Sequence, residues 1–354
     1  MRLLACIIAF ISADVAYSSS EVVTPAGFMV TATVICEGDV CDHVRASTQL
    51  AMQFITNVIA FKKVVDLHVV YQPCYGVGCN PSKPAVCSTK IDTLADENGH
   101  EQLFPRALSK QLGLEIPYQP IDVKISFNSL LFPSEASKWQ ADQIRFLCLL
   151  NHEIIHGLGL VSSYLPDVRG FLHPQMYPSL VNDNFVTKFY DTPFDSHTHL
   201  LPKMTLTNFT KTLNELPYIP FLKSQNATAL RQTKHYSLFR LFNNLLTRHR
   251  SDQPVYFNAS NQVIQLDTSL SPFQPGVSLV HLLNPQPFDT LMSHSTDYSH
   301  FKDLLRDSPD WAQSPYGPQT LAILETLGYT INPNPNLTLS MSHYYKSTLT
   351  GLAN

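Results

Sequence analysis

Charged side chains are scarce in this chain, and neither sign dominates. Only 15% of the 354 residues are Asp, Glu, Lys or Arg, and the formal net charge is −4. Proteins that bind nucleic acids usually present a concentrated basic surface. We therefore expect no nucleic-acid partner.

Long apolar runs are also missing, apart from a short one near the N-terminus. The run from Leu3 to Ile11 follows Arg2 and is too short to cross a bilayer stably. With the small-x-small sequence Ala16-Tyr17-Ser18 after it, this pattern predicts a signal peptide over residues 1–18. We expect a secreted, extracellular protein without stable membrane insertion.

The cysteines that remain after residue 18 form an even set, which suits an oxidising compartment. They allow up to three disulfides, but the sequence does not determine the pairing, and Cys148 can instead be a buried free thiol. Their spacings match no standard zinc-finger pattern. The set is Cys36, Cys41, Cys74, Cys79, Cys87 and Cys148.

Apolar periodicity predicts the elements of a first block, residues 19–161. Apolar residues at helical spacing over 51–59 predict a helix, and strict alternation over 65–71 and 121–127 predicts two strands. A run without Gly or Pro from Trp139 predicts a buried helix that continues through residue 156. Helices do not alternate regularly with strands, so we expect an α+β fold.

Residues 162–275 are rich in Pro, Asn, Thr and His and predict a large insertion, with one amphipathic helix over 227–248. The insertion is either a lid or exosite, or a surface decoration. Residues 276–354 form the last block, with a closing helix over 319–327 that stops at Gly328. Four sequons predict a glycoprotein with exposed loops, at Asn208, Asn226, Asn258 and Asn336.

The most specific motif is His-Glu-Ile-Ile-His at residues 152–156. Residues four apart lie on one face of a helix, so His152 and His156 can bind one metal ion while Glu153 stands beside the open coordination position. The pattern favours a zinc hydrolase in which Glu153 is the general base. The alternative is a core helix whose histidines are satisfied by hydrogen bonds.

A catalytic zinc ion needs a third protein ligand. The compact metzincin motif would place it at Ser162, and serine is a poor zinc ligand. A glutamate from a following helix is disfavoured, because no Glu occurs between Glu153 and Glu215. An aspartate such as Asp191 or Asp195 remains open.

A later segment offers a histidine in a specific setting. The sequence Gly276-Val277-Ser278-Leu279-Val280-His281 precedes Leu291-Met292-Ser293, and His281 and Met292 are 292 − 281 = 11 positions apart. Together with residues 139–160, this segment resembles leishmanolysin, a metzincin subfamily in which a long insertion precedes the third histidine. The likeness covers about residues 139–160 and 276–293, and it departs from the subfamily in having Val280 and Leu282 beside the histidine.

The resemblance implies a zincin or metzincin-like, two-lobed catalytic domain with a large insertion. Its Zn²⁺ would be held by His152, His156 and His281, with Glu153 as the base.

The same resemblance assigns roles to three residues around the metal. Gly159 would make the sharp turn after the helix, and Met292 would form the methionine turn beneath the metal. His294, two residues later, would either contact the substrate oxyanion or be a solvent-exposed histidine or one that supports the ligands.

We therefore predict a secreted zinc metalloendopeptidase that hydrolyses peptide bonds by Glu-assisted attack of zinc-bound water on a peptide or protein. Two alternatives remain: a zincin with an Asp as third ligand, and a secreted binding protein on a metzincin scaffold without catalysis. Zinc content together with casein cleavage separates them. The sequence indicates neither the physiological substrate nor the oligomeric state.

Overall fold

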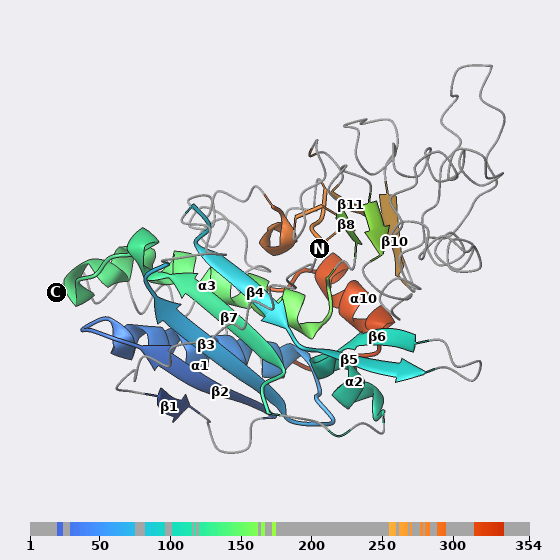
Figure 1. Ribbon diagram of the computed structural model, residues 1–354, viewed down its shortest axis with the longest axis horizontal. Coiled ribbons are helices and arrows are strands. Elements are labelled where there is room, and N and C mark those ends of the chain that lie inside the picture. The colour runs from blue at the N-terminus through green and yellow to red at the C-terminus, as the bar shows by residue number, and fades with distance from the viewer. Residues whose placement is uncertain are drawn as a thin grey trace, which may run out of the picture.

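The fold was analysed in a computed structural model (Figure 1). It describes residues 20–23, 29–74, 82–95, 101–114, 117, 120–161, 164–166, 172–174, 255–259, 262–267, 270, 277–278, 280–283, 289–294 and 315–335. The first half of the chain contributes β1 (Ser20–Val23), β2 (Val30–Cys36), α1 (Cys41–Val58), β3 (Val65–Gln72), β4 (Ala85–Thr89), β5 (Ile91–Ala95), β6 (Glu101–Pro105), α2 (Arg106–Leu112), β7 (Val123–Asn128), η1 (Ser129–Leu131) and α3 (Ala136–Leu158). The remainder contributes β8 (Tyr164–Pro166), β9 (Leu172–Pro174), β10 (Val255–Ala259), β11 (Gln262–Leu266), η2 (Thr290–Met292) and α10 (Pro318–Leu327).

A five-stranded mixed sheet forms the centre of the described core, which is mixed α/β. Its strand order is β1-β2-β3-β7-β4. The three inner strands run parallel, whereas β1 and β4 are antiparallel to their neighbours. This arrangement makes β4 one edge of the sheet.

Helices α1 and α3 lie side by side against one face of this sheet (Figure 1). Helix α1 connects β2 to β3 and packs on β2, while α3 packs on β7 and β4. Aromatic rings fill the space between α3 and the strands, with the ring centroids of Phe127 and Phe146 4.3 Å apart. Trp139 at the start of α3 is fully buried in the same cluster.

The predicted helix and strand segments are present with shifted boundaries. The apolar residues at helical spacing over 51–59 belong to the longer α1, and the alternating apolar residues over 65–71 correspond to β3. The prediction of a strand from Ile121 was wrong by two residues, because Ile121 adopts a left-handed conformation (φ 70°) and β7 begins at Val123. Strand β2 was not predicted, although its residues alternate between buried and half-buried positions.

A β-hairpin within the predicted insertion belongs to the core. Strands β10 and β11 pair antiparallel, and their Phe257 and Ile264 are fully buried. Figure 1 shows α10 beside this hairpin, and both strands contact the helix. Helix α10 ends at Gly328 (φ 115°), as predicted, and the hydroxyl of Tyr329 then donates to the carbonyl of Leu158 at 2.6 Å.

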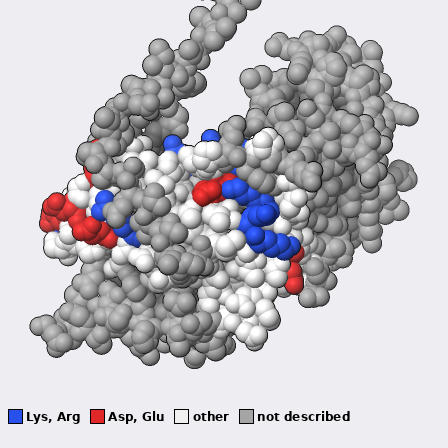
Figure 2. Space-filling view, turned by 90° about the horizontal axis from the view of Figure 1, so that it is seen from below, with Lys and Arg blue, Asp and Glu red and all other residues white. Residues whose placement is uncertain are grey.

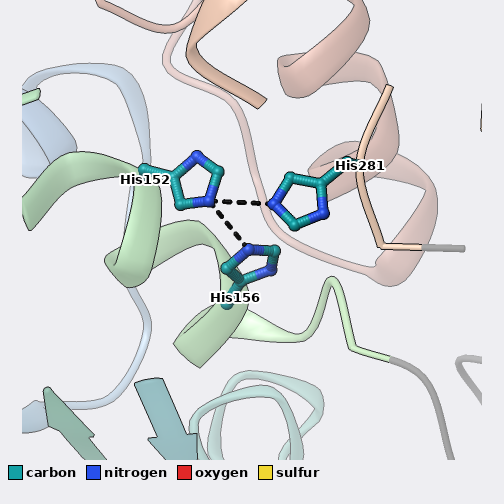
Figure 3. Close-up of side chains that lie close together, drawn as sticks. All are labelled: His152, His156 and His281. Carbon is teal, nitrogen blue, oxygen red and sulfur yellow. Dashed lines mark hydrogen bonds between the residues drawn. The ribbon is translucent and has the colours of Figure 1, made fainter. Parts of the chain in front are cut away.

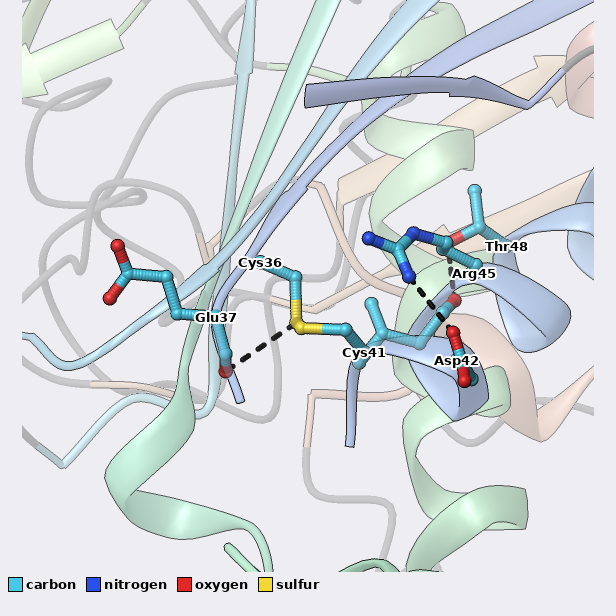
Figure 4. The surroundings of a disulfide bond; sticks show 7 residues. Cys36, Glu37, Cys41, Asp42, Arg45 and Thr48 are labelled. Atoms are coloured by element: carbon cyan, nitrogen blue, oxygen red, sulfur yellow. Dashed lines mark hydrogen bonds and ion pairs between the residues drawn. A yellow bond between two sulfur atoms is a disulfide. The ribbon is translucent and has the colours of Figure 1, made fainter. Parts of the chain in front are cut away.

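The cysteines divide into bonded and free groups. A disulfide joins Cys36 at the end of β2 to Cys41 at the start of α1 (Figure 4). Cys74 is also disulfide-bonded. Cys148 is a buried free thiol. Cys87, which the sequence allowed to take part in a disulfide, is a free thiol on β4.

The described surface carries charges of both signs. Figure 2 shows Lys and Arg side chains next to Asp and Glu on the face in view. Within the described residues, no helix is long and apolar enough to cross a membrane.

Several sequence-based expectations fall outside the described residues. They are the signal peptide, Cys79, Ser162, Asp191, Asp195, Glu215, the helix over 227–248, Gly276 and the sequons at Asn208, Asn226 and Asn336. The remaining sequon, Asn258, lies in β10 where a loop was expected.

Candidate metal centre

The C-terminal half of α3 is buried and presses closely on the sheet. At Gly157 an added Cβ would come within 2.3 Å of a methyl group of Val123 on β7, so this position admits no side chain without a shift. Gly159 then ends the helix with φ 133°, a conformation that favours glycine, as expected. These two glycines fix the depth and the end of the helix that carries His152 and His156.

The third histidine is held by the β10–β11 hairpin and the turn η2. The backbone N–H of Asp267, which follows β11, donates to the carbonyl of His281 at 2.8 Å. The N–H of Leu282 donates to the carbonyl of Met292, also at 2.8 Å. His281 therefore lies between two backbone segments that are far from α3 in sequence.

Three imidazoles meet at this point (Figure 3). The Nε2 atom of His152 lies 3.0 Å from Nε2 of His156 and 3.1 Å from Nε2 of His281. All three side chains are buried. Ligand nitrogens around a tetrahedral zinc ion, each about 2.0–2.1 Å from the metal, are separated by about 3.3 Å. The spacing of the cluster is therefore close to what such an ion requires.

The other ring nitrogen of each histidine faces a backbone carbonyl. Nδ1 of His152 donates to Leu291 at 2.6 Å, Nδ1 of His156 donates to Leu160 at 2.8 Å, and Nδ1 of His281 donates to Val277 at 2.8 Å. A carbonyl can only accept, so each Nδ1 carries the proton in a neutral ring. The three Nε2 lone pairs then point toward one another.

Burial keeps these rings neutral. Desolvation lowers the pKa of His152 to about 4. Desolvation and the neighbouring His152 lower the pKa of His156 to about 3, and desolvation with the other two rings lowers the pKa of His281 well below its usual value. Three converging lone pairs without protons repel one another, and a cation between them removes that repulsion. The donor set therefore fits a zinc ion.

Glu153 lies beside the cluster and faces the edge strand β4. Its carboxylate accepts a hydrogen bond from the backbone N–H of Cys87. Burial raises the pKa of Glu153 to about 7, against the opposing effects of that N–H and of the positive charge of Lys83. A carboxyl group with such a pKa can both take up and release a proton near neutral pH.

The turn that contains Met292 contacts α3 and the histidine cluster. Met292 is fully buried, and the adjacent Leu291 supplies the carbonyl that orients His152. Asp289 anchors this turn, because its carboxylate accepts the backbone N–H groups of Gln319 and Thr320 at the start of α10. The turn η2 thus connects the histidine cluster to α10.

His294 lies next to His281, with ring centroids 6.4 Å apart, and pairs with the carboxylate of Asp267. Sequence reasoning singled out His294 but missed Asp267, because no local motif links two residues on separate segments. It also missed Tyr316, whose hydroxyl donates to the side chain of Asn151 just before His152.

The chain was compared with protein families, curated proteins and solved structures. No curated protein and no solved structure matches it. The family model described as SPBPB7E8-like matches residues 11–353, which is nearly the whole chain. The chain therefore belongs to the SPBPB7E8-like family.

Proposed function

We propose that this protein is a secreted zinc-dependent endopeptidase of the metzincin type. The observation that carries the proposal is the convergence of the three Nε2 atoms, each left unprotonated by a carbonyl that binds Nδ1. His152, His156 and His281 would hold the ion. Zinc bound there would supply a Lewis acid that polarises a peptide carbonyl and activates water.

Glu153 performs the proton transfers in this proposal. Its buried carboxylate is next to His152 in sequence and borders the cluster without belonging to it. Glu153 takes a proton from the attacking water and delivers it to the nitrogen of the departing amine. In the metal-free protein, burial raises the pKa of Glu153 to about 7, and a carboxyl group that titrates near neutral pH can take up and release a proton at low cost.

The edge strand β4 offers a place for an extended peptide. Among the described strands, β4 pairs only with β7, and its residues Val86 and Ser88 are exposed. A strand edge with unused backbone groups can bind a substrate chain through main-chain hydrogen bonds. Because Cys87 of the same strand donates to Glu153, a peptide along β4 would run past the general base.

The proposal is tested by the metal content and the activity of a Glu153→Gln variant. The purified protein should hold one equivalent of zinc and cleave casein. Glu153→Gln should retain the zinc and lose most hydrolysis, because this residue is a base and not a ligand. Glu325→Gln, an exposed glutamate on α10, is the matched control and should behave as wild type. If Glu153→Gln were as active as wild type, Glu153 would not be the general base. Bound zinc without any cleavage of casein would favour a non-catalytic metal protein.

The third ligand is tested by metal retention alone. His281→Ala should release zinc to a chelator faster than His294→Ala, Asp191→Ala or Asp195→Ala, since loss of a direct ligand costs more than loss of a supporting group. His68→Ala, on β3, controls for loss of an unrelated histidine. Faster release from an aspartate variant than from His281→Ala would identify a zincin of another type.

A further inference from the structure

A lysine stands just before the edge strand β4. The pairing of β4 with β7 continues to Pro84, whose carbonyl accepts the backbone N–H of Asn128 at 3.0 Å. Lys83, the residue before Pro84, is exposed. Its backbone is therefore held close to the line of the strand, while its side chain is accessible from solvent.

Lys83 belongs to the row of residues that faces α3. Successive side chains of a strand point to opposite faces of the sheet. Thr89 marks the face covered by α3, because its hydroxyl donates to the carbonyl of Gly157 at 3.2 Å. Counting back from Thr89 in steps of two, through Cys87, reaches Lys83, on the same face of the sheet as Glu153. The positive charge of Lys83 acts on Glu153, where it opposes the effect of burial on the pKa of the carboxyl group.

The segment around β4 carries positive charges and no negative ones. From Leu67 to Ile91 the sequence contains Lys83 and Lys90, but neither Asp nor Glu. Within the part of the chain that the structure describes, Lys83 forms no ion pair. A cation exposed beside a strand edge can pair with an acidic side chain of a peptide that binds along that edge.

We propose that Lys83 makes the protein prefer peptides with an Asp or Glu at a fixed distance from the cleaved bond. This preference rests on the proposed peptidase function and gives the class of substrate. A peptide that extends the sheet at β4 would place its side chains opposite those of β4, with Cβ atoms about 5 Å apart on the same face. Cys87 donates to the general base, and Lys83 precedes Cys87 by 87 − 83 = 4 positions. The acidic residue of the substrate should therefore lie about four residues from the bond that is cleaved.

The test uses fluorogenic peptides that differ only in the placement of a single Glu, Gln or Lys, which is moved along both sides of the cleaved bond. The kcat/KM of each peptide is measured for wild type, Lys83→Gln and Lys83→Glu. Lys124→Glu is the matched control, since it makes the same change of charge at an exposed position of β7. Its neighbour Val123 packs against Gly157 of α3, so Lys124 lies on the other face of the sheet. Ratios of kcat/KM between peptides cancel any effect of a variant on the general base.

Wild type should show a kcat/KM about fivefold higher for Glu than for Gln at the position about four residues from the cleaved bond, as for opposite charges on adjacent strands. Lys83→Gln should lose this difference, and Lys83→Glu should favour the Lys peptide instead. Lys124→Glu should keep the wild-type preference. Because Lys83 is exposed, raising the ionic strength from about 0.01 M to about 1 M should weaken the preference of wild type.

Equal cleavage of the Glu, Gln and Lys peptides at every position would overturn the inference, and so would a preference for Glu that survives in Lys83→Glu. Failure of the proposed function gives a different result, because wild type would then cleave none of the peptides. Fluorescence anisotropy of labelled Glu and Lys peptides with wild type and Lys83→Glu would still test the role of Lys83, since binding along β4 requires no cleavage. Equal binding of the two peptides to wild type would overturn that role. Lys83 is exposed and lies outside β4, so its variants should fold.

Discussion

Acid should destabilise the metal-free protein through the same histidines that are proposed to bind zinc. The folded-state pKa is about 4 for His152 and about 3 for His156, against an unfolded value of 6.5. Below pH 6.5 the unfolded chain therefore binds more protons than the folded chain. The free energy of unfolding should fall as the pH drops from about 6.5 toward about 4.

The magnitude follows from these pKa values. Between about pH 7.5 and about pH 5, each imidazole that protonates only in the unfolded chain costs about 2 kcal/mol. His152 and His156 together should therefore cost about 4 kcal/mol, and the lowered pKa of His281 adds to the loss in the same direction. A domain is stable by about 5–15 kcal/mol, so the effect is a large fraction of the total.

Urea denaturation with a chelator present measures this effect. Wild type is compared at both pH values with the His152→Leu/His156→Leu double variant, which removes both titrating groups and keeps apolar bulk. Asp122 and Asp289, whose pKa values are raised by burial, are present in both proteins, so their contributions cancel in the difference. If the pH dependence of the two proteins differed by less than about 1 kcal/mol, burial would not be holding the imidazoles neutral. The three Nε2 atoms would then be open to protonation and would not require a cation between them.

Three further outcomes are expected. Gly157→Ala should lower the free energy of unfolding by about 1–3 kcal/mol, measured in urea, because its Cβ would overlap the stiff side chain of Val123; a change within 0.5 kcal/mol would contradict this. Tyr316→Phe should cost about 1–3 kcal/mol by removing the donor to Asn151 in the buried centre of the protein, and calorimetric unfolding would detect it as a lower Tm. Cys148, whose thiol is fully buried and has its pKa raised well above the usual value, should react with a maleimide only after unfolding, and modification of the native protein at this residue would disprove its burial.

The local part of the site could be predicted from the sequence. Spacing of four residues on a helix brings His152 and His156 together, and a glycine at position 159 ends that helix with positive φ. Alternation over 65–71 was sufficient to predict β3, since every second side chain there faces the core. In each case a stretch of sequence shorter than the helix or strand was sufficient for the prediction.

Other features of the fold could not be predicted from a short stretch of sequence. The hairpin of β10 and β11 lies in a segment rich in polar residues, and among its described side chains Phe257, Ala259, Ile264 and Leu266 belong to the core. Ile121 fits the alternation of a strand, yet its backbone turns at that point while Asp122 bonds Lys110 through its side chain. Tertiary contacts decide such positions, and residue type alone does not.

The long separation between the proposed ligands has a simple physical basis. His281 follows His156 by 281 − 156 = 125 positions, yet each doubling of a loop adds only about 0.6 kcal/mol to the cost of closing it. The number of intervening residues is therefore a weak constraint on the site. The strong constraint is that the segment around His281 must be held in place. The backbone of Asp267, just after β11, bonds His281, and the backbone of Met292 in η2 bonds Leu282. We conclude that substitutions in these two supports should weaken metal retention more than changes in the length of the intervening chain.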